Sequence, residues 1–255
     1  MKQLRIDINC DMGESYGRFS VGNDEQIFPW ISSSNIACGF HGGDPFHIEH
    51  TIRLALKHKV RIGAHPGYPD LQGFGRRDMK IPAQELRAII KYQIAAVKGL
   101  TESLGGRLAY VKPHGALYNA ASRDAEETKV ILQAIQEIDS GLAFMGLAGS
   151  VMQRLAKEAQ LPFIAEAFAD RRYEPDGKLM SRSKSQAVIQ DPDQAVEQVL
   201  SIFLNQAVHC SDGSVLPMEA QSFCIHGDNP AAPRILKALD TALAVQKIEK
   251  LKQER

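Results

Sequence analysis

Short apolar runs alternate with longer amphipathic stretches along most of this chain. Seven runs have the length and composition of buried strands, at residues 4–9, 35–38, 60–64, 108–112, 142–146, 163–167 and 223–226. Glycine and polar residues cluster at the ends of these runs, and a stretch with helical periodicity follows most of them. Strands that alternate with helices favour a parallel sheet with right-handed crossover connections.

The amphipathic stretches carry clear helix boundaries. Apolar residues recur at helical spacing from Leu86 to Leu104, and a Gly-Gly pair follows them. Asp-Pro pairs at 44–45 and 191–192 supply an N-cap and a first helical residue for two more helices. We expect the last helix to run from about Pro233 to the charged tail at 247–255, and we expect this tail to be a solvated face.

The sixth and seventh predicted strands are separated by an insertion at about 171–222, where a single crossover helix would suffice. Turn sequences at 175–177 and 211–214 predict two hairpin-like excursions that flank one helix. Such an insertion either shapes a site or contacts a partner, or it is a tolerated surface feature. We therefore expect a single domain over residues 1–255 that contains this insertion.

A parallel sheet can be open or closed, and the strand ends favour closure. An open dinucleotide-binding sheet usually carries G-x-G-x-x-G after a strand, and the sequence lacks this motif. Instead, ionisable residues follow nearly every predicted strand, as expected when all the strand ends face one shared mouth. The sequence thus predicts an α/β fold, a seven-stranded parallel β/α barrel of the TIM-like kind.

Composition limits the kinds of binding partner and the cellular location that the sequence predicts. The 255 residues are 44% hydrophobic and 24% charged, and 30 basic residues balance 30 acidic ones. A net charge of zero offers no attraction for nucleic acid or for an anionic membrane. No signal-peptide pattern and no apolar run of membrane-spanning length is present, and the four cysteines are scattered. We expect a cytoplasmic protein with no nucleic-acid and no membrane partner.

Acidic residues occupy the first strand and the loop after it. Asp7, Asn9 and Asp11 are two residues apart, so they point to the same face of an extended chain, and Glu14 follows them. In a barrel this face is the interior, where a carboxylate costs several kcal/mol unless it is paired or binds a ligand. The pattern favours a functional site.

Histidines lie at three further strand ends, as His65, His114 and His226. A single histidine beside an apolar strand is usually structural, but three at strand ends indicate that at least one takes part in the chemistry. His41 follows the second strand in a glycine-rich loop, where the backbone can approach a ligand closely.

The remaining candidates are mostly charged. Lys112 ends the fourth strand, where it could orient a carbonyl or carboxylate group or pair with Asp11. Arg76 and Arg77 follow a glycine-rich loop and suit a carboxylate or phosphate, unless they form surface salt bridges. The last two strands contribute Glu166, Asp170, Arg171 and Asp228.

Seven segments at these strand ends, in order over almost the whole chain, resemble the LamB/YcsF family. They read DINCDMGESYG (7–17), NIACGFHGGDP (35–45), IGAHPGYPDLQGFGRR (62–77), VKPHGALYN (111–119), EAFADRRY (166–173), LMSR (179–182) and CIHGDNP (224–230). The resemblance implies a seven-stranded barrel similar to the polysaccharide-deacetylase-like barrels. It also implies cleavage of the cyclic amide 5-oxo-L-proline to L-glutamate, driven by ATP hydrolysis, together with two further subunits, B and C.

Opening an unreactive lactam in this way requires groups that bind the substrate carboxylate, stabilise phosphate charge and deprotonate water. As hypotheses, Asp11 or His114 is the base, Lys112 polarises the carbonyl group, and Arg76, Arg77 or Arg171 binds anions. His65 and Glu166 complete the catalytic candidates. The other residues expected to bind substrate or anions are Asn9, Glu14, His41, Asp170, His226 and Asp228.

ATP cannot be placed on a known loop, because the sequence contains no Walker A motif. A divalent metal such as magnesium could accompany the nucleotide. Two alternatives remain open at this point. One is a metal-dependent amide or N-acetyl hydrolase of the deacetylase-like barrel type, in which zinc could bind near the barrel mouth to Asp11, His41, His65 and His226, although these residues show no compact spacing. The other is a non-catalytic subunit that binds substrate for a partner.

Overall fold

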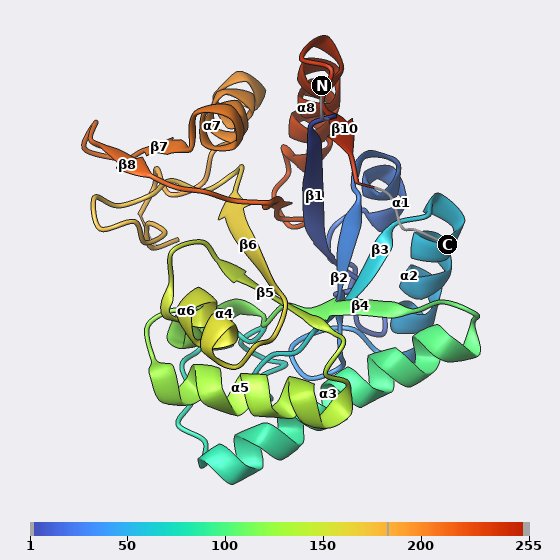
Figure 1. Ribbon diagram of the computed structural model, residues 1–255. Helices are drawn as coiled ribbons and strands as arrows, with labels where there is room; N and C mark the ends of the chain where they lie inside the picture. Colours follow the sequence, from blue (N-terminus) through green and yellow to red (C-terminus); the bar gives the residue numbers. More distant parts are fainter. Residues whose placement is uncertain (1–2, 183, 252–255) are drawn as a thin grey trace.

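A computed structural model of the chain describes residues 3–182 and 184–251, and its centre is a closed barrel of parallel strands (Figure 1). The seven barrel strands are β1 (Arg5–Met12), β2 (Ser33–Ala37), β3 (Arg61–His65), β4 (Leu108–Val111), β5 (Ala143–Leu147), β6 (Phe163–Phe168) and β9 (Ser222–Ile225). Each pairs in parallel with its neighbours, and β1 pairs with both β2 and β9, which closes the sheet. The predicted seven-stranded parallel barrel is confirmed.

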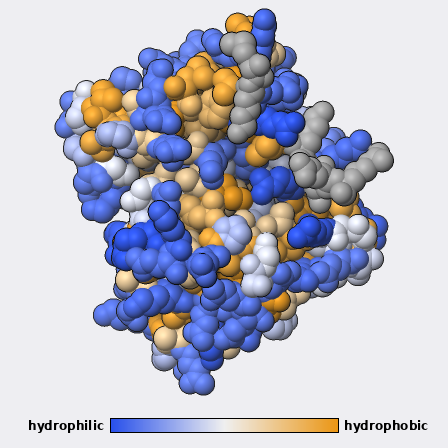
Figure 2. All heavy atoms as spheres, in the orientation of Figure 1, coloured by the Kyte–Doolittle hydropathy of each residue, from blue (hydrophilic) through white to orange (hydrophobic). Residues whose placement is uncertain are grey.

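Helices cover the outside of this barrel (Figure 1). The longer ones are α2 (Pro45–His58), α3 (Ala83–Ser103), α4 (Gly115–Ala121), α5 (Ala125–Ile138), α6 (Val151–Glu158), α7 (Pro192–Asn205) and α8 (Ala232–Val245). A short helix α1 (Asp24–Ile27) and a 3-10 helix η1 (Phe28–Trp30) precede β2. Polar and charged residues cover most of the face seen in Figure 2, as expected for amphipathic helices wrapped around a core.

Helix α2 shows how the local sequence fixes these boundaries. The Asp44 carboxylate accepts hydrogen bonds from the backbone N–H groups of Phe46 and His47, and Pro45 occupies the first helical position. Lys59 ends the helix in the left-handed conformation with φ 57°. The helix therefore begins where its sequence predicts.

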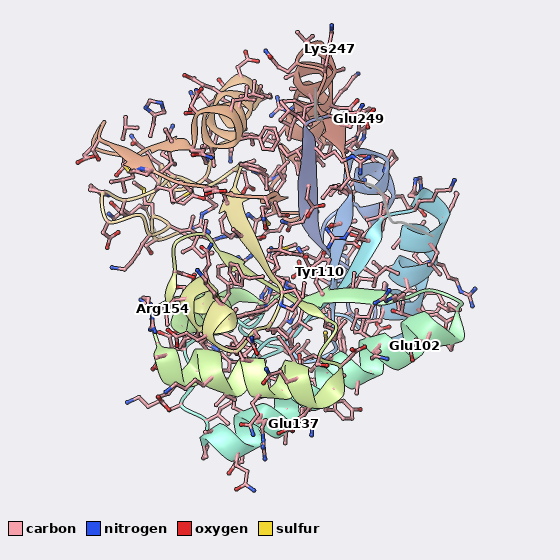
Figure 3. The ribbon with its side chains drawn as sticks, in the orientation of Figure 1. Glu102, Tyr110, Glu137, Arg154, Lys247 and Glu249 are labelled. Carbon is pink, nitrogen blue, oxygen red and sulfur yellow. The ribbon has the colours of Figure 1, made fainter. Side chains whose placement is uncertain are left out.

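The barrel interior is polar along one face of β1. Asp7 is fully buried, and its carboxylate accepts hydrogen bonds of 2.6 Å from the hydroxyl groups of Ser32, Ser33 and Ser222. Tyr110 also lies inside the barrel, as Figure 3 shows, whereas charged residues such as Glu102 and Glu137 lie at the periphery. Asp7 is thus stabilised by hydroxyl donors at the end of the barrel away from its mouth.

The segment between β6 and β9 extends away from the barrel wall (Figure 1). Its first part folds back on itself through isolated antiparallel bridges, between Arg171 and Val188 and between Tyr173 and Leu179. Helix α7 follows, and then a hairpin of β7 (Ala207–His209) and β8 (Val215–Pro217). This segment supplies part of the rim of the cavity described below.

The carboxyl-terminal tail differs in part from the expectation. Helix α8 ends at Val245, and β10 (Glu249–Lys250) pairs in parallel with the start of β1. Ile248 is buried, and Lys250 Nζ donates to the carbonyl group of Trp30 at 3.0 Å. The expectation of a solvated face is confirmed at Lys247 and Glu249, which are exposed, and is wrong at Ile248, whose buried side chain anchors the tail. Residues 252–255 lie outside the described residues. None of the described helices combines the length and apolar composition of a membrane-spanning segment.

Candidate active site at the barrel mouth

A cavity of about 430 Å³ opens at the carboxyl ends of the barrel strands. Strand ends, the loops after them and the segment between β6 and β9 all contribute to its wall. The predicted site residues that line it are Asp11, Glu14, His65, Arg76, Lys112, His114, Arg171, His226 and Asp228. In β/α barrels this end of the sheet carries the active site, so the cavity is the candidate active site.

Lys112 is the centre of a buried ionic network at the floor of the cavity. Its Nζ lies 3.0 Å from Asp11 Oδ1 and 2.8 Å from Glu166 Oε1, and it also donates to Asn9 Oδ1 at 3.2 Å. Although burial lowers the pKa of Lys112, the charges of Asp11 and Glu166 raise it well above its usual value. Lys112 is therefore a fixed positive charge between two carboxylates.

Asp11 faces the cavity from the end of β1. Its Oδ1 accepts a hydrogen bond of 2.7 Å from Asn35, and its Oδ2 lies 3.3 Å from His65 Nε2. Burial raises the pKa of Asp11, but the charges of His65 and Lys112 outweigh burial and hold the pKa well below its usual range. The side chain is an ionised carboxylate at neutral pH.

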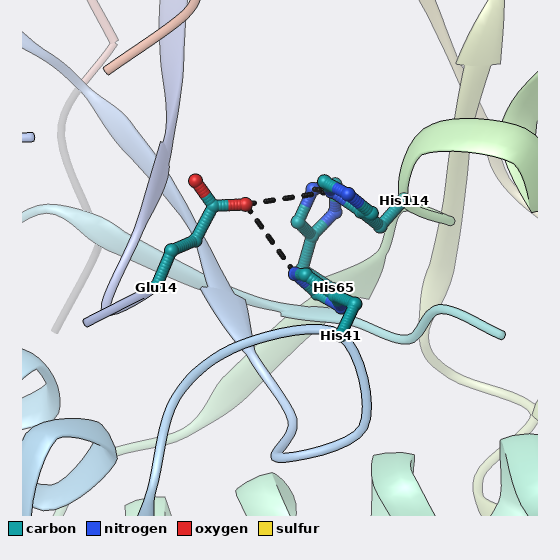
Figure 4. Close-up of side chains that lie close together, drawn as sticks. All are labelled: Glu14, His41, His65 and His114. Carbon is teal, nitrogen blue, oxygen red and sulfur yellow. Dashed lines mark hydrogen bonds and ion pairs between the residues drawn. The ribbon is translucent and has the colours of Figure 1, made fainter. Parts of the chain in front are cut away.

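Four buried side chains converge beside this network, one from the carboxyl end of each of four consecutive strands. Glu14 follows β1, His41 follows β2, His65 ends β3 and His114 follows β4 (Figure 4). Glu14 Oε1 lies 3.3 Å from His41 Nε2 and 3.4 Å from His114 Nδ1. His65 Nε2 lies 3.0 Å from His114 Nδ1. We call this set the histidine cluster.

Burial keeps most of the histidine cluster uncharged. It lowers the pKa of His41 and the pKa of His114 well below the usual value for an imidazole. Burial, together with the charge of Asp11, raises the pKa of Glu14 to about 8. One carboxyl group and two imidazoles therefore favour their neutral forms in the protein as described.

His226 forms a second functional unit on the opposite side of β1. Its Nδ1 lies 2.8 Å from Asp170 Oδ1, and its ring is stacked on Phe168 with centroids 5.4 Å apart. Asn229 donates to the other oxygen of Asp170 at 3.1 Å. Although burial raises the pKa of Asp170, the charge of His226 and these hydrogen bonds lower it below its usual value. Because the Asp170 carboxylate accepts a hydrogen bond from Nδ1–H of His226, Nε2 is the nitrogen without hydrogen in the neutral ring. Nε2 can therefore accept a proton.

Cationic side chains form the rim near β6 and β9. Asp228 pairs with Arg76 at 2.6 Å and with Arg182 at 3.1 Å. Arg171 is buried, and its Nη2 donates to the carbonyl group of Met180 at 2.6 Å. Burial and the nearby charge of Arg182 lower the pKa of Arg171 to about 10. This rim suits an anionic group of a ligand.

Several predicted residues do not line the cavity. Arg77 is bound to Asp70 through Nε at 3.0 Å, and its side chain is 64% exposed, so the structure separates it from its neighbour Arg76. Three others lie behind the residues that line the cavity and hydrogen-bond to them: Asn9 and Glu166 bind Lys112, and Asp170 binds His226. The last, His41, lies in the histidine cluster.

The expected metal set is not formed as a unit. Among the described residues, His41 and His65 group with Glu14 and His114, whereas Asp11 and His226 group with Cys224. The reason is the strand order, because β9, which carries His226, lies on the other side of β1 from β2 and β3.

The structure also adds residues that the sequence reasoning missed. Tyr118 donates to Glu166 Oε2 at 2.7 Å, Asn35 binds Asp11, and Arg182 pairs with Asp228. Tyr118 lies one helical turn after His114 at the start of α4, and this spacing could have indicated that both side chains face the site. Asn35 points into the barrel from β2, by the same alternation of side chains that directs Asp7, Asn9 and Asp11 inward from β1.

These features define a protein of the β/α-barrel class related in fold to carbohydrate deacetylases. A family 4 carbohydrate esterase from Streptomyces lividans superposes with a TM-score of 0.52, over 97% of this chain and 91% of that chain, and its 10% identity supports similarity of fold alone. The chain itself belongs to the LamB/YcsF family, which residues 6–255 match.

Two relatives illustrate the membership. The chain is 47% identical over 246 residues to the A subunit of 5-oxoprolinase from Acinetobacter baylyi, covering 96% of this chain and 97% of that protein. The crystal structure of a lactam utilization protein from Thermus thermophilus superposes with a TM-score of 0.92 at 42% identity, covering 98% of this chain and all of that chain. The resemblance inferred from the seven strand-end segments is thereby confirmed.

Proposed function

We propose that this chain is the A subunit of a 5-oxoprolinase, which cleaves 5-oxo-L-proline to L-glutamate at the expense of ATP. The observation that carries the proposal is the overlap, over almost the entire length of both chains, with relatives that bear this name. A polar cavity with an anion-binding rim, an ionised carboxylate and a histidine oriented by an aspartate supports it.

The rim gives the substrate carboxylate a binding place. The substrate combines a carboxylate with a lactam carbonyl group, so one end must meet cations and the other must meet the reacting groups. We propose that Arg171 and Arg182 bind the carboxylate, because their guanidinium groups disfavour each other's charge unless an anion lies between them. Arg76 and Asp228 then fix the position of Arg182.

His226 is the base that the geometry supports best. Ring opening adds water to the carbonyl carbon, breaks the carbon–nitrogen bond and transfers a proton to the leaving nitrogen. His226 lines the cavity, and Asp170 orients its ring, so it can take the proton from water and later return it to nitrogen. By contrast, His114 has Phe74 O at 2.8 Å from Nε2 and His65 at 3.0 Å from Nδ1. The hypotheses of Asp11 or His114 as base therefore rank below His226.

Lys112 and Asp11 act together at the floor of the cavity. We assign Lys112 to stabilise negative charge that develops on the carbonyl oxygen, as the sequence suggested, while Asp11 and Glu166 hold its ammonium group in place. A charge held in place before the reaction costs no reorganisation when the reaction occurs. ATP, accompanied by magnesium, would phosphorylate the carbonyl oxygen and release ADP. Addition of water and cleavage of the carbon–nitrogen bond would then leave an acyl phosphate, which a second water hydrolyses to glutamate and phosphate. Partner subunits B and C and a cytoplasmic location belong to the same proposal.

Reconstitution tests the proposal directly. The chain is combined with its candidate B and C partners, and ADP release and glutamate formation are measured with and without 5-oxo-L-proline. We expect both products to depend on 5-oxo-L-proline and on this chain. Equal glutamate formation when this chain is omitted would contradict the proposal. Loss of turnover on substituting His226 in the complete complex would separate a catalytic subunit from one that only carries substrate.

A metal-dependent amide or N-acetyl hydrolase is the second candidate, and the histidine cluster is the observation that favours it. This function needs no nucleotide. Hydrolysis of N-acetylated sugars or simple lactams by the isolated chain with zinc, in the absence of ATP, would support it over the first proposal.

A further inference from the structure

We propose that Glu14, His41, His65 and His114 bind one divalent transition-metal ion of the zinc class. The proposal concerns binding alone and does not depend on the reaction that the enzyme catalyses. One ligand comes from the carboxyl end of each of β1, β2, β3 and β4, so the barrel itself brings the four together. All four side chains are buried.

Backbone carbonyl groups fix the protons of two of the imidazoles. Nδ1 of His65 lies 2.7 Å from the carbonyl oxygen of Lys112, and Nε2 of His114 lies 2.8 Å from that of Phe74. A carbonyl oxygen can only accept, so both of these ring nitrogens carry the hydrogen. In the neutral rings, His65 Nε2 and His114 Nδ1 then carry lone pairs, and they face each other at 3.0 Å. His65 Nε2 also lies 3.3 Å from Asp11 Oδ2, so a proton on this nitrogen, which pairs it with Asp11, competes with a metal ion for the same lone pair. Metal-binding histidines are commonly oriented through the other ring nitrogen in this way.

A proton shared by this pair does not account for the remaining atoms. Among the described residues, Glu14 Oε1 and both ring nitrogens of His41 are buried without a hydrogen-bond partner. Unpaired buried polar atoms are costly, and two of these, Glu14 Oε1 and His41 Nε2, lie 3.3 Å apart within the cluster. A single cation at the centre would satisfy Glu14, His41, His65 and His114 together.

The distances fit a tetrahedral ion. Bonds of about 2.1 Å to nitrogen and oxygen place tetrahedral ligands about 3.4 Å apart. Glu14 Oε1 lies 3.3 Å from His41 Nε2 and 3.4 Å from His114 Nδ1. The parallel rings of His41 and His114 cannot both direct in-plane lone pairs at one point, so one must tilt on binding. His41 is the ring that can tilt, because no hydrogen bond from the described residues holds its nitrogens.

The ligand types select the metal. Three imidazoles and one carboxylate suit zinc, and also iron, nickel or copper, whereas magnesium prefers oxygen ligands and water. The ion inferred here is therefore distinct from the magnesium that would accompany ATP. If such an ion were bound next to the cavity, it would supply Lewis acidity to a group bound there.

Titration of the chelator-treated full-length protein with Zn²⁺, followed by calorimetry, tests the proposal. We expect one ion per chain, and an affinity at least about 100-fold lower in His65→Gln and His41→Gln, because even the loss of a residue that only orients a ligand costs about 10–100-fold. His47→Gln is the matched control, since His47 lies on α2 with Asp44 at 2.7 Å from its Nδ1, and it should bind zinc like the unaltered protein.

Circular dichroism and urea unfolding establish that each variant is folded, and Glu14→Gln replaces any histidine variant that is not. Co²⁺, added as a second probe, should give visible absorption bands that these ligand variants lose. Equal zinc affinity in the folded ligand variants and the unaltered protein would overturn the proposal. So would loss of binding in Cys224→Ser with retention in His41→Gln, which would place the ion at Asp11, Cys224 and His226 instead.

Discussion

The imidazole of His41 is stacked on that of His114, with ring centroids 3.7 Å apart and planes 3° from parallel. Two glycines of the loop after β3 make room for this stack. A Cβ at Gly67 would lie 2.8 Å from His41 Nδ1, and a Cβ at Gly75 would lie 2.7 Å from His41 Cβ and 2.8 Å from His114 Cδ2. The glycine-rich loop is therefore a close-fitting cover for the histidine cluster.

Gly75→Ala should disturb the cluster more than backbone strain alone explains. Gly75 has φ +62°, so any side chain there is strained, and its Cβ also contacts both rings. Gly149→Ala is the matched control, because Gly149 has φ +72° and nothing within 4 Å of the added Cβ. We expect a loss of about 1–2 kcal/mol in unfolding free energy for the control and about 1–3 kcal/mol more for Gly75→Ala. Urea unfolding measures both, and equal losses would show that the contacts with the rings do not matter.

Arg171→Gln should weaken substrate binding, because Arg171 lines the anion-binding rim. We expect KM for 5-oxo-L-proline in the reconstituted complex to rise by about 10–100-fold, the range that corresponds to about 1.5–3 kcal/mol for a charged hydrogen bond. Arg77→Gln is the control, since Arg77 pairs with Asp70 outside the cavity and should leave KM nearly unchanged. A larger effect in Arg77→Gln than in Arg171→Gln would contradict the assignment.

Arg76 and Arg77 show where prediction from sequence reaches its limit. The alternation of strands and helices and the acidic face of β1 are local patterns, so the barrel and the inward direction of Asp11 could be predicted. Which of the two adjacent arginines turns toward the cavity depends on its acidic partner. Asp228, the partner of Arg76, is distant in the sequence, and the sequence alone does not identify Asp70 as the partner of Arg77. The histidine cluster was likewise hidden, because its four ligands come from four strand ends and share no compact spacing.

His226→Gln should reduce kcat in the reconstituted complex by about 100–10,000-fold, the usual contribution of a general base. Glutamine retains a similar size and polarity but cannot take a proton. His47→Gln, on the outside of the barrel, should leave kcat near that of the unaltered complex. Single-turnover assays with saturating 5-oxo-L-proline would separate this effect from weaker binding. A His226→Gln complex with near-normal kcat would remove His226 from the role of base.

Asp170→Asn should cost stability at neutral pH and much less in acid. His226 faces Asp170 directly, with Arg171 and Cys224 nearby, and the pKa of Asp170 is lower in the folded protein than its usual value. A depressed pKa means that the carboxylate stabilises the fold above about pH 3.9, and that this contribution is lost as the pH falls toward the folded-state pKa. The difference in unfolding free energy between the unaltered protein and the variant should therefore shrink between pH 6 and pH 3, as measured by urea unfolding. A constant difference would show that charge is not the cause.

Lys112→Met tests whether the buried network is one unit. The substitution leaves Asp11 and Glu166 as neighbouring buried carboxylates without their common cation, so we expect a loss of about 3–5 kcal/mol in unfolding free energy. Adding Glu166→Gln to Lys112→Met removes one of the two carboxylates that have lost their cation. The loss of unfolding free energy in the double variant should therefore be smaller than the sum of the losses in the two single variants.

Arg53→Met provides the comparison for an exposed pair. Arg53 and Glu49 lie 2.7 Å apart on α2, with side chains 61% and 45% exposed, and such a pair contributes about 0–1 kcal/mol. If Lys112→Met cost no more than Arg53→Met, the ammonium group would not be neutralising the two carboxylates. In that case one of them would have to be protonated in the folded protein, and Lys112 could not serve as the fixed charge beside the reacting carbonyl group.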